Sequence, residues 1–231
     1  MNLKKTIVKY FIEFIVIVIG VSISFYAENY NDSLNKIQLK NQSLNRILEN
    51  LKVDNRDNRF NYKAHSESLI SSEWILANRN NLSAYSRDTI GFHLSRAINF
   101  ITYFVDNQEE YKTIQSSGYI EYIENESLVK GLQGKYVQHK FMKFLEEEIR
   151  SKAKVLADFE FKNSKINNDS IYMGSYLIYK RYIGDLEIPN EFYDRIIEKA
   201  SYQKIYLKSI KRRIQRDSIL ANEIKKEILV D

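Results

Sequence analysis

The chain has 231 residues, no cysteine, one proline and seven glycines, and it carries 35 basic and 30 acidic residues. The lack of cysteine excludes disulfides and thiolate metal sites, and the scarcity of proline and glycine is typical of long helices rather than of sheets with many tight turns. The charges are interspersed along the chain, as on a solvated helical surface, and we therefore expect no nucleic-acid partner.

The first predicted element is an apolar run from Tyr10 to Ala27. As a helix this run would span roughly 27 Å, close to the thickness of one hydrocarbon core. It contains one carboxylate, Glu13, and it has Phe25 where a signal-peptide cleavage site ending at Ala27 would need a small residue. We therefore expect a retained transmembrane anchor in the lipid bilayer. A cleaved signal peptide is the alternative.

The charges on either side of the run predict its orientation. Lys4, Lys5 and Lys9 precede it, whereas Glu28 and Asp32 follow it directly. The positive-inside rule then favours an N-terminus in the cytoplasm and the bulk of the protein in the periplasm, at the cytoplasmic (inner) membrane. Basic residues soon after the run reduce this asymmetry.

One face of the predicted span carries Glu13, Gly20, Ser24 and Ala27. Gly20 and Ser24 have the small-xxx-small spacing that lets two helices approach closely, and a carboxylate on the same face can form hydrogen bonds between helices. We expect this face to pack against another transmembrane helix. The alternatives are an interfacial ion pair between Glu13 and Lys9, which lies four residues earlier, and an ion or proton pathway.

Beyond the run, the helical pattern continues into a long juxtamembrane helix. Apolar residues alternate at steps of three and four if one asparagine takes a place in the stripe, and these residues are Leu34, Ile37, Asn41, Leu44, Leu48 and Leu51. Such a short seam with a polar member sets register in coiled coils. Packing against the protein's own helices is favoured over a self-assembling coiled coil.

The next two helices are predicted from their ends. Asp88 is the expected N-cap of a helix with one apolar face, formed by Ile90, Leu94, Ala97, Ile98, Ile101 and Phe104. A helix from about Glu109 should end at Gly118, because glycine readily adopts the left-handed conformation that terminates helices. Ser116 and Ser117 complete this helix-stop motif. The motif lacks the lysine of a P-loop and the glycine spacing of a hydrolase elbow.

Two long helical regions complete the chain. Asn125 or Ser127 should cap an amphipathic helix that reaches about Phe161, and Asn163–Asp169 is expected to be a loop. A last helical region runs from Asn190 to about residue 229, with a break near residue 200 left open. No strand is predicted. The sequence therefore predicts an all-α protein with a helical bundle of four to six helices beyond the anchor. Its expected divisions are a tail (1–9), the anchor (10–27), the juxtamembrane helix (28–65) and the bundle (66–231).

Two segments resemble a family of uncharacterised single-pass membrane proteins of Bacteroidota, a domain of unknown function. The first comprises residues 13–20 and 25–32, an acid-led apolar helix that ends in a polar patch, in which Tyr30 stands in a tryptophan position and Glu28 replaces an asparagine. The second is residues 111–123, similar to the family's Tyr-x-x-Leu-x-Ser-Ser-Gly-x-Leu-x-x-Ile block. The resemblance implies an anchored, mostly helical envelope protein and no known activity.

Residues outside these segments give no catalytic signature. His65, His93 and His139 lack metal-ligand spacing. The run of glutamates at 146–148 and the basic cluster at 208–216 are expected on solvated helix faces. The tyrosines at positions 172, 176 and 179 should pack in the core rather than line a ligand pocket.

We expect no cofactor and a non-enzymatic role as a membrane-anchored subunit or scaffold of a cell-envelope complex, in which the partners are other membrane or envelope subunits or a second copy of the chain. The alternative is an extracytoplasmic ligand-sensing module that signals through a partner protein.

Overall fold

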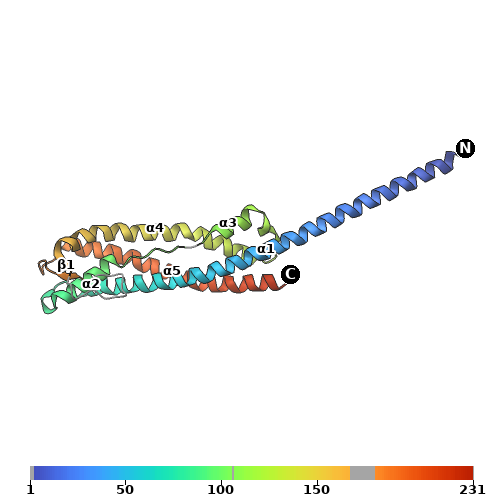
Figure 1. The fold of residues 1–231 in the computed structure, drawn as a ribbon. Coiled ribbons are helices and arrows are strands. Elements are labelled where there is room, and N and C mark those ends of the chain that lie inside the picture. Colours follow the sequence, from blue (N-terminus) through green and yellow to red (C-terminus); the bar gives the residue numbers. More distant parts are fainter. Residues whose placement is uncertain (1–2, 106, 167–179, 231) are drawn as a thin grey trace.

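The computed structural model describes residues 3–105, 107–166 and 180–230, and in this part of the chain the fold is all-α apart from one short two-stranded ribbon. The elements are α1 (Leu3–Ala77), a 3-10 turn (Leu82–Ala84), α2 (Arg87–Asn99), α3 (Glu109–Ser116), a second 3-10 turn (Tyr119–Tyr122), α4 (Glu126–Asn163), β1 (Ser164–Ile166), β2 (Lys180–Tyr182) and α5 (Asn190–Val230). The N-terminal part of α1 projects from one end of a bundle that the rest of α1 forms with the other helices (Figure 1).

The helix α1 is continuous for 75 residues. Its N-terminal part is long and apolar enough to cross a membrane, and none of the described side chains from Ile7 to Asn35 is buried by the rest of the chain. The helix then passes without a break into the bundle, where Lys40 is its first fully buried residue. The predicted division between residues 65 and 66 falls inside this helix.

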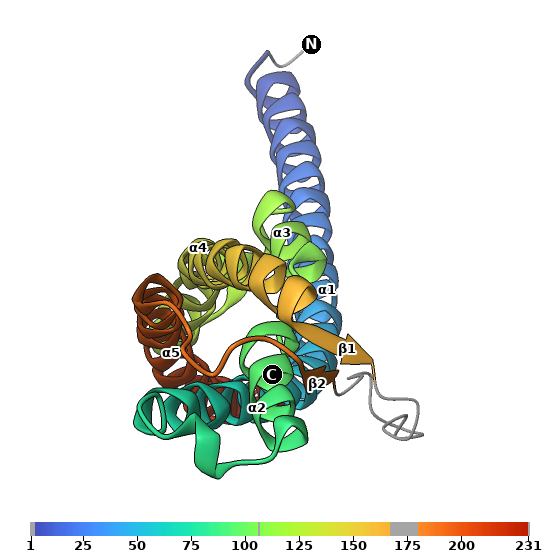
Figure 2. The same ribbon diagram turned by 90° about the vertical axis from the view of Figure 1, so that its left-hand side faces the viewer.

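The bundle has an up-down-up-down arrangement. We call the end from which α1 projects the proximal end and the opposite end the distal end. The helices α1 and α4 run toward the distal end, and α5 returns beside them to the proximal end, where the C-terminus lies (Figures 1 and 2). The other segment that runs toward the proximal end lies between α1 and α4 in the chain and consists of α2, an extended stretch and α3. We call its stretch from Phe100 to Val105 the strap.

Buried residues follow steps of three and four along each long helix, as in a coiled coil. On α1 these positions are Lys40, Leu44, Ile47, Leu51, Asp54, Asn58, Asn61, His65, Ser68, Ser72 and Ile75. On α5 they are Phe192, Ile196, Lys199, Gln203, Tyr206, Ile210, Arg213, Asp217, Leu220, Ile224 and Glu227. This seam of α1 contacts the protein's own helices, but it passes through Ile47 rather than Leu48, and Leu34 is exposed.

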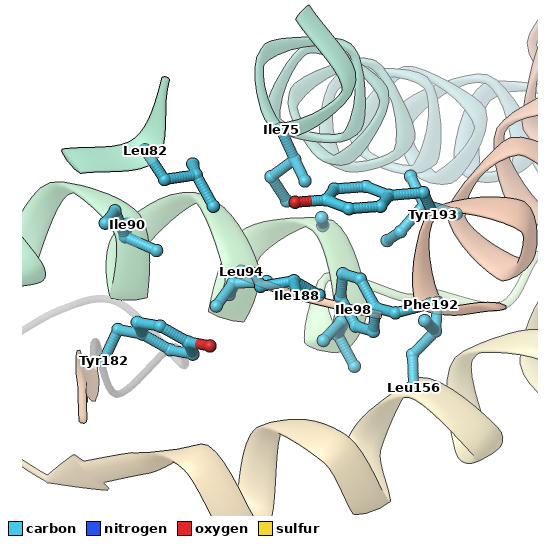
Figure 3. Packing of buried hydrophobic residues seen from close by; sticks show 12 residues of the cluster. Ile75, Leu82, Ile90, Leu94, Ile98, Leu156, Tyr182, Ile188, Phe192 and Tyr193 are labelled. Carbon is cyan, nitrogen blue, oxygen red and sulfur yellow. The ribbon is translucent and has the colours of Figure 1, made fainter. Parts of the chain in front are cut away.

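Apolar side chains fill both ends of the bundle. The distal cluster joins α2 to the ends of α1, α4 and α5, with Leu94, Ile98 and Phe192 near its centre (Figure 3). The proximal cluster joins α1, α3, α4 and α5 and includes Leu44 and Leu132. A smaller cluster of α4 and α5 lies between them. Hydrophobic packing therefore stabilises both ends of the bundle, and most of the buried polar residues of the seams lie between these ends.

The structure corrects two helix boundaries. Ser86, not Asp88, caps α2, because its side chain accepts a hydrogen bond from the backbone of Thr89. The helix ends at Asn99, so Phe104 reaches the core from the strap and not from a helix. Of the two predicted caps of α4, Asn125 is the one observed, with its side chain accepting from two backbone N–H groups.

The structure corrects one further expectation and answers one open question. Of the predicted loop, Asn163 ends α4 and the next three residues form β1, which pairs antiparallel with β2 so that Ser164 lies opposite Tyr182. A Cβ atom at Gly91 of α2 would lie 1.7 Å from the carbonyl oxygen of Lys180, so only glycine lets the ribbon pack this closely. The last helix, α5, has no break near Ala200.

Candidate functional site

The predicted packing face of the span is free of contacts with the rest of the chain. A Cβ atom at Gly20 would meet no atom within 4 Å, and Glu13 lies 3.8 Å from Lys9 with half of its side chain exposed. The hydroxyl of Ser24 donates to the carbonyl oxygen of Gly20 at 3.0 Å, so it is satisfied within its own helix. Ala27 is exposed as well. The face therefore remains available for a partner helix.

The helix-stop motif has the geometry of a helix terminus. Gly118 adopts φ 75°, in the left-handed region. The hydroxyls of Ser116 and Ser117 donate to the carbonyl oxygen of Thr113 at 3.2 and 2.8 Å, and Ser117 lies within 3.3 Å of the carbonyl oxygen of Ile114. These bonds satisfy carbonyl groups that the end of α3 leaves without helical partners.

The strap is the part of the bundle that needs buried polar partners, because an extended segment among helices has no intrahelical bonds for its backbone. On the α1 side, the ring of His65 lies 3.1 Å from the carbonyl oxygen of Thr102. About two helical turns nearer the proximal end, the carboxylate of Asp57 accepts from the N–H of Val105 at 3.1 Å. His65 of the seam and the partly buried Asp57 beside it therefore take the place of helical hydrogen-bond partners for the strap.

On the α4 side, Glu146 has the same role. Its carboxylate accepts from the N–H of Phe104 and from the hydroxyl of Tyr206, both at 2.7 Å. Lys143 donates to the carbonyl oxygen of Phe104 and lies 3.0 Å from Glu146. The expectation that the glutamate run is a solvated face is therefore wrong for Glu146, which is 2% exposed because it binds the strap.

The basic cluster of α5 is also divided. Arg213 is buried, and its guanidinium lies 4.1 Å from the centre of the Phe104 ring, a distance at which a cation is attracted to an aromatic face. Lys208, Lys211 and Arg216 of the same cluster are exposed. The heptad spacing of α5 explains the difference, since Arg213 occupies a seam position and the other three do not.

Two buried ion-pair groups join α1 to the other long helices. Near the proximal end, Lys40 lies 3.2 Å from Glu227, which also accepts from the backbone N–H groups of two residues before α4. Deeper in the bundle, the ammonium of Lys135 lies 2.8 Å from Asp54 and 3.2 Å from Asp217. The three side chains of this triad are at most 4% exposed.

Burial shifts the pKa values of three seam residues. Desolvation raises the pKa of Asp217, which Lys135 partly offsets. It lowers the pKa of His65 to about 4 and that of Lys199 to about 7. Because the carbonyl of Thr102 can only accept, Nε2 of the neutral His65 ring carries the proton, and Nδ1 faces the side-chain amide of Gln203 at 3.4 Å.

A groove of about 470 Å³ lies between α4 and α5, outside the buried triad. Its lining includes Gly131, Gly134 and Gln138 from α4 and Arg216 and Ile219 from α5, with Lys135 and Asp217 of the triad. No motif in the sequence pointed to this groove. Two glycines three residues apart inside a long helix were the available signal, because glycine is unfavourable there without a structural reason.

The three histidines do not form a common site. His65 lies in the seam, His93 stacks on Trp74 with ring centres 3.9 Å apart, and His139 lines a separate hollow near α3. Within the described ranges, no group of three potential ligand side chains could hold a metal ion. The tyrosines at positions 172, 176 and 179 lie outside the described residues.

Comparison with known proteins gives no relative: no protein-family model matches the chain, and no curated protein or solved structure matches it. The resemblance to the Bacteroidota family therefore stays a prediction that depends on two short segments.

Proposed function

We propose that this protein is a non-enzymatic, membrane-anchored helical subunit or scaffold of a cell-envelope complex. The observation that carries the proposal is the continuity of α1, which is one helix from the apolar segment into the bundle core. Roughly 20 Å of helix separates Ala27 from Lys40, at about 1.5 Å per residue. A partner bound to the span would therefore be coupled to the bundle through one rigid element.

The non-enzymatic part of the proposal rests on how the bundle uses its charged groups. Glu146 binds the strap, Lys40 pairs with Glu227, and Lys135 pairs with two aspartates. Buried polar groups need such partners to offset their desolvation. These groups therefore have a structural explanation that requires no substrate.

The proposed place of action is the cytoplasmic membrane, with the N-terminus in the cytoplasm and the bundle in the periplasm. The lysines before the apolar segment support this orientation. Fusions at the C-terminus test it: alkaline phosphatase should be active there, and a fluorescent protein that folds only in the cytoplasm should be dark. The reverse pair of results would reverse the orientation.

The scaffold role is tested at the packing face. We expect Gly20→Ile to weaken co-purification of partner subunits or of a second copy several-fold, because it blocks close approach of helices. Nothing in the chain lies within 4 Å of a Cβ atom at Gly20, so the substitution causes no clash of its own. Glu13→Gln should have a milder effect, since the amide still forms hydrogen bonds.

The matched control for this test is Val18→Leu, which enlarges an exposed residue on another side of the same span. Both variants should insert into the membrane and keep the helical content of the bundle. Equal association of Gly20→Ile and Val18→Leu would mean that the span is only a tether.

The second candidate function is a ligand-sensing module, and the groove between α4 and α5 favours it. The groove lies beside the triad, in which Asp54 belongs to the helix that leads to the membrane. A ligand there would contact Lys135, which forms an ion pair with Asp54 of α1. This candidate needs a partner protein to transmit the signal.

A further inference from the structure

We propose that the groove between α4 and α5 binds a small amphiphilic anion, a molecule with an apolar body and one carboxylate. This inference names a ligand class for the second candidate function, and it is independent of the scaffold role.

The size and shape of the groove come from two glycines of α4. A Cβ atom at Gly134 would meet no atom within 4 Å, so the helix backbone itself forms the floor of the groove there. A Cβ atom at Gly131 would lie 3.0 Å from the side chain of Leu220, so α4 and α5 approach closely at that point. The resulting volume of about 470 Å³ is in the range of small-molecule sites.

The wall of the groove formed by α5 carries an apolar patch beside its charged residues Arg213, Arg216, Asp217 and Glu223. Ile219 and Leu220 form this patch, and Ile219 is 59% exposed although it is a large hydrophobic residue. Covering such a side chain with the apolar body of a ligand removes hydrocarbon surface from water, which favours binding. A wholly polar ligand would leave this patch in contact with water.

The remaining polar groups favour an anion. Lys135 and Asp217 already pair with each other at the base of the groove, and the carboxylate of Glu223 accepts from the hydroxyl of Ser127 at 3.1 Å. Within the part of the chain that the structure describes, Arg216 has no carboxylate within ion-pair distance. A guanidinium is the donor best suited to a carboxylate, because it can donate two parallel hydrogen bonds.

Gln138 adds an exposed amide to the same lining, and its N–H groups can donate beside the guanidinium. The groove therefore combines an apolar patch, a glycine floor and two donors at its polar side. A neutral or cationic molecule of the same shape would lose the charge-assisted bond to Arg216.

The test uses the full-length chain in nanodiscs of zwitterionic lipid and three probes of matched size: 4-(4-fluorophenyl)butyrate, the corresponding butanol and the corresponding butylamine. Fluorine NMR measures binding, and empty nanodiscs correct for partition into lipid. We expect saturable binding of the carboxylate at one site per chain, with weaker binding of the alcohol and the amine. Binding of all three probes with equal affinity, or no saturable binding of the carboxylate at millimolar concentration, would overturn the proposal.

Two pairs of variants place the binding in the groove. Gly134→Leu fills the floor and should abolish carboxylate binding, whereas Ser151→Leu adds the same side chain to an exposed position of α4 outside the groove. Arg216→Gln should raise the Kd of the carboxylate about tenfold, the size of one charge-assisted bond. Arg212→Gln, exposed on the same helix but outside the lining, should leave it unchanged.

Far-UV circular dichroism checks that each variant keeps its helical content. Unchanged carboxylate binding by a folded Gly134→Leu variant would overturn the proposal. The scaffold role is measured separately, by association that depends on Gly20, so failure of one proposal does not imply failure of the other.

Discussion

The buried triad makes a strong prediction about stability. The ammonium of Lys135 lies between two carboxylates, 2.8 Å from Asp54 and 3.2 Å from Asp217. In Lys135→Met, two carboxylates that are each 2% exposed face each other without their shared cation. Removing one side of a buried ion pair costs about 3–5 kcal/mol, mainly because the remaining charge is desolvated and unpaired. We expect a loss of this size in the free energy of unfolding at pH 7.

The assay is urea unfolding of the full-length chain in detergent micelles, followed by the fluorescence of Trp74, the one tryptophan of the sequence, which packs against the distal cluster. Lys130→Met is the matched control on the same helix. Its ammonium pairs with Glu126 at the surface, where both side chains are mostly exposed, so the change should be within about 0.5 kcal/mol.

Two further measurements separate charge from packing. The cost of Lys135→Met should shrink when the pH is lowered from 7 to 5, because protonation neutralises the two carboxylates that have lost Lys135. The triple variant with Asp54→Asn and Asp217→Asn should recover most of the lost stability. If the single variant loses less than about 1 kcal/mol, or if the triple variant is no more stable than the single one, the reasoning about desolvated charge is refuted.

The remaining predictions concern single residues. The pKa of His65 is about 4 in the folded protein and near 6.5 in the unfolded chain. Because the unfolded state takes up the proton first as the pH falls, the free energy of unfolding should decrease by up to about 3 kcal/mol between pH 6.5 and 4. Urea titrations at each pH measure this decrease, and it should be smaller in His65→Gln. Burial lowers the pKa of Lys199 to about 7, and its partners, Ala97 and Ser68, are neutral. Lys199→Met should therefore raise the urea midpoint at pH 6, where the lysine is charged in both states, and an unchanged or lower midpoint would contradict this. Gly118→Ala should cost about 1–2 kcal/mol in the same assay, because φ 75° is strained for an L-residue, and an unchanged midpoint would argue against a left-handed helix stop.

The parts of the fold that could be predicted are those in which local chemistry agrees with the final environment. The apolar run from Tyr10 to Ala27 can be identified without knowledge of tertiary contacts, because its length and composition are sufficient. The apolar face of α2 and the cap at Asn125 are predictable for the same reason. Each of these signals lies within one or a few helical turns.

The seam could be followed only where it is apolar. Apolar periodicity predicts it as far as Leu51 and no further, because the next positions, Asp54, Asn58 and Asn61, are polar. Their spacing of three and four residues continues the heptad without interruption. Hydrophobic periodicity does not reveal a buried stripe of polar residues, because it is defined by the spacing of apolar side chains.

The sequence alone therefore determined the helical class, the apolar N-terminal helix that could cross a membrane and the ends of several helices, all of which depend on short-range propensity and hydropathy. Only the tertiary structure explains the burial of polar side chains in the bundle. The segment from α2 to α3 is interrupted by the strap, whose backbone groups require partners from helices that are distant in the sequence, such as Glu146 for Phe104. The groove has the same origin, because its floor and its wall belong to α4 and α5, which are adjacent only after folding.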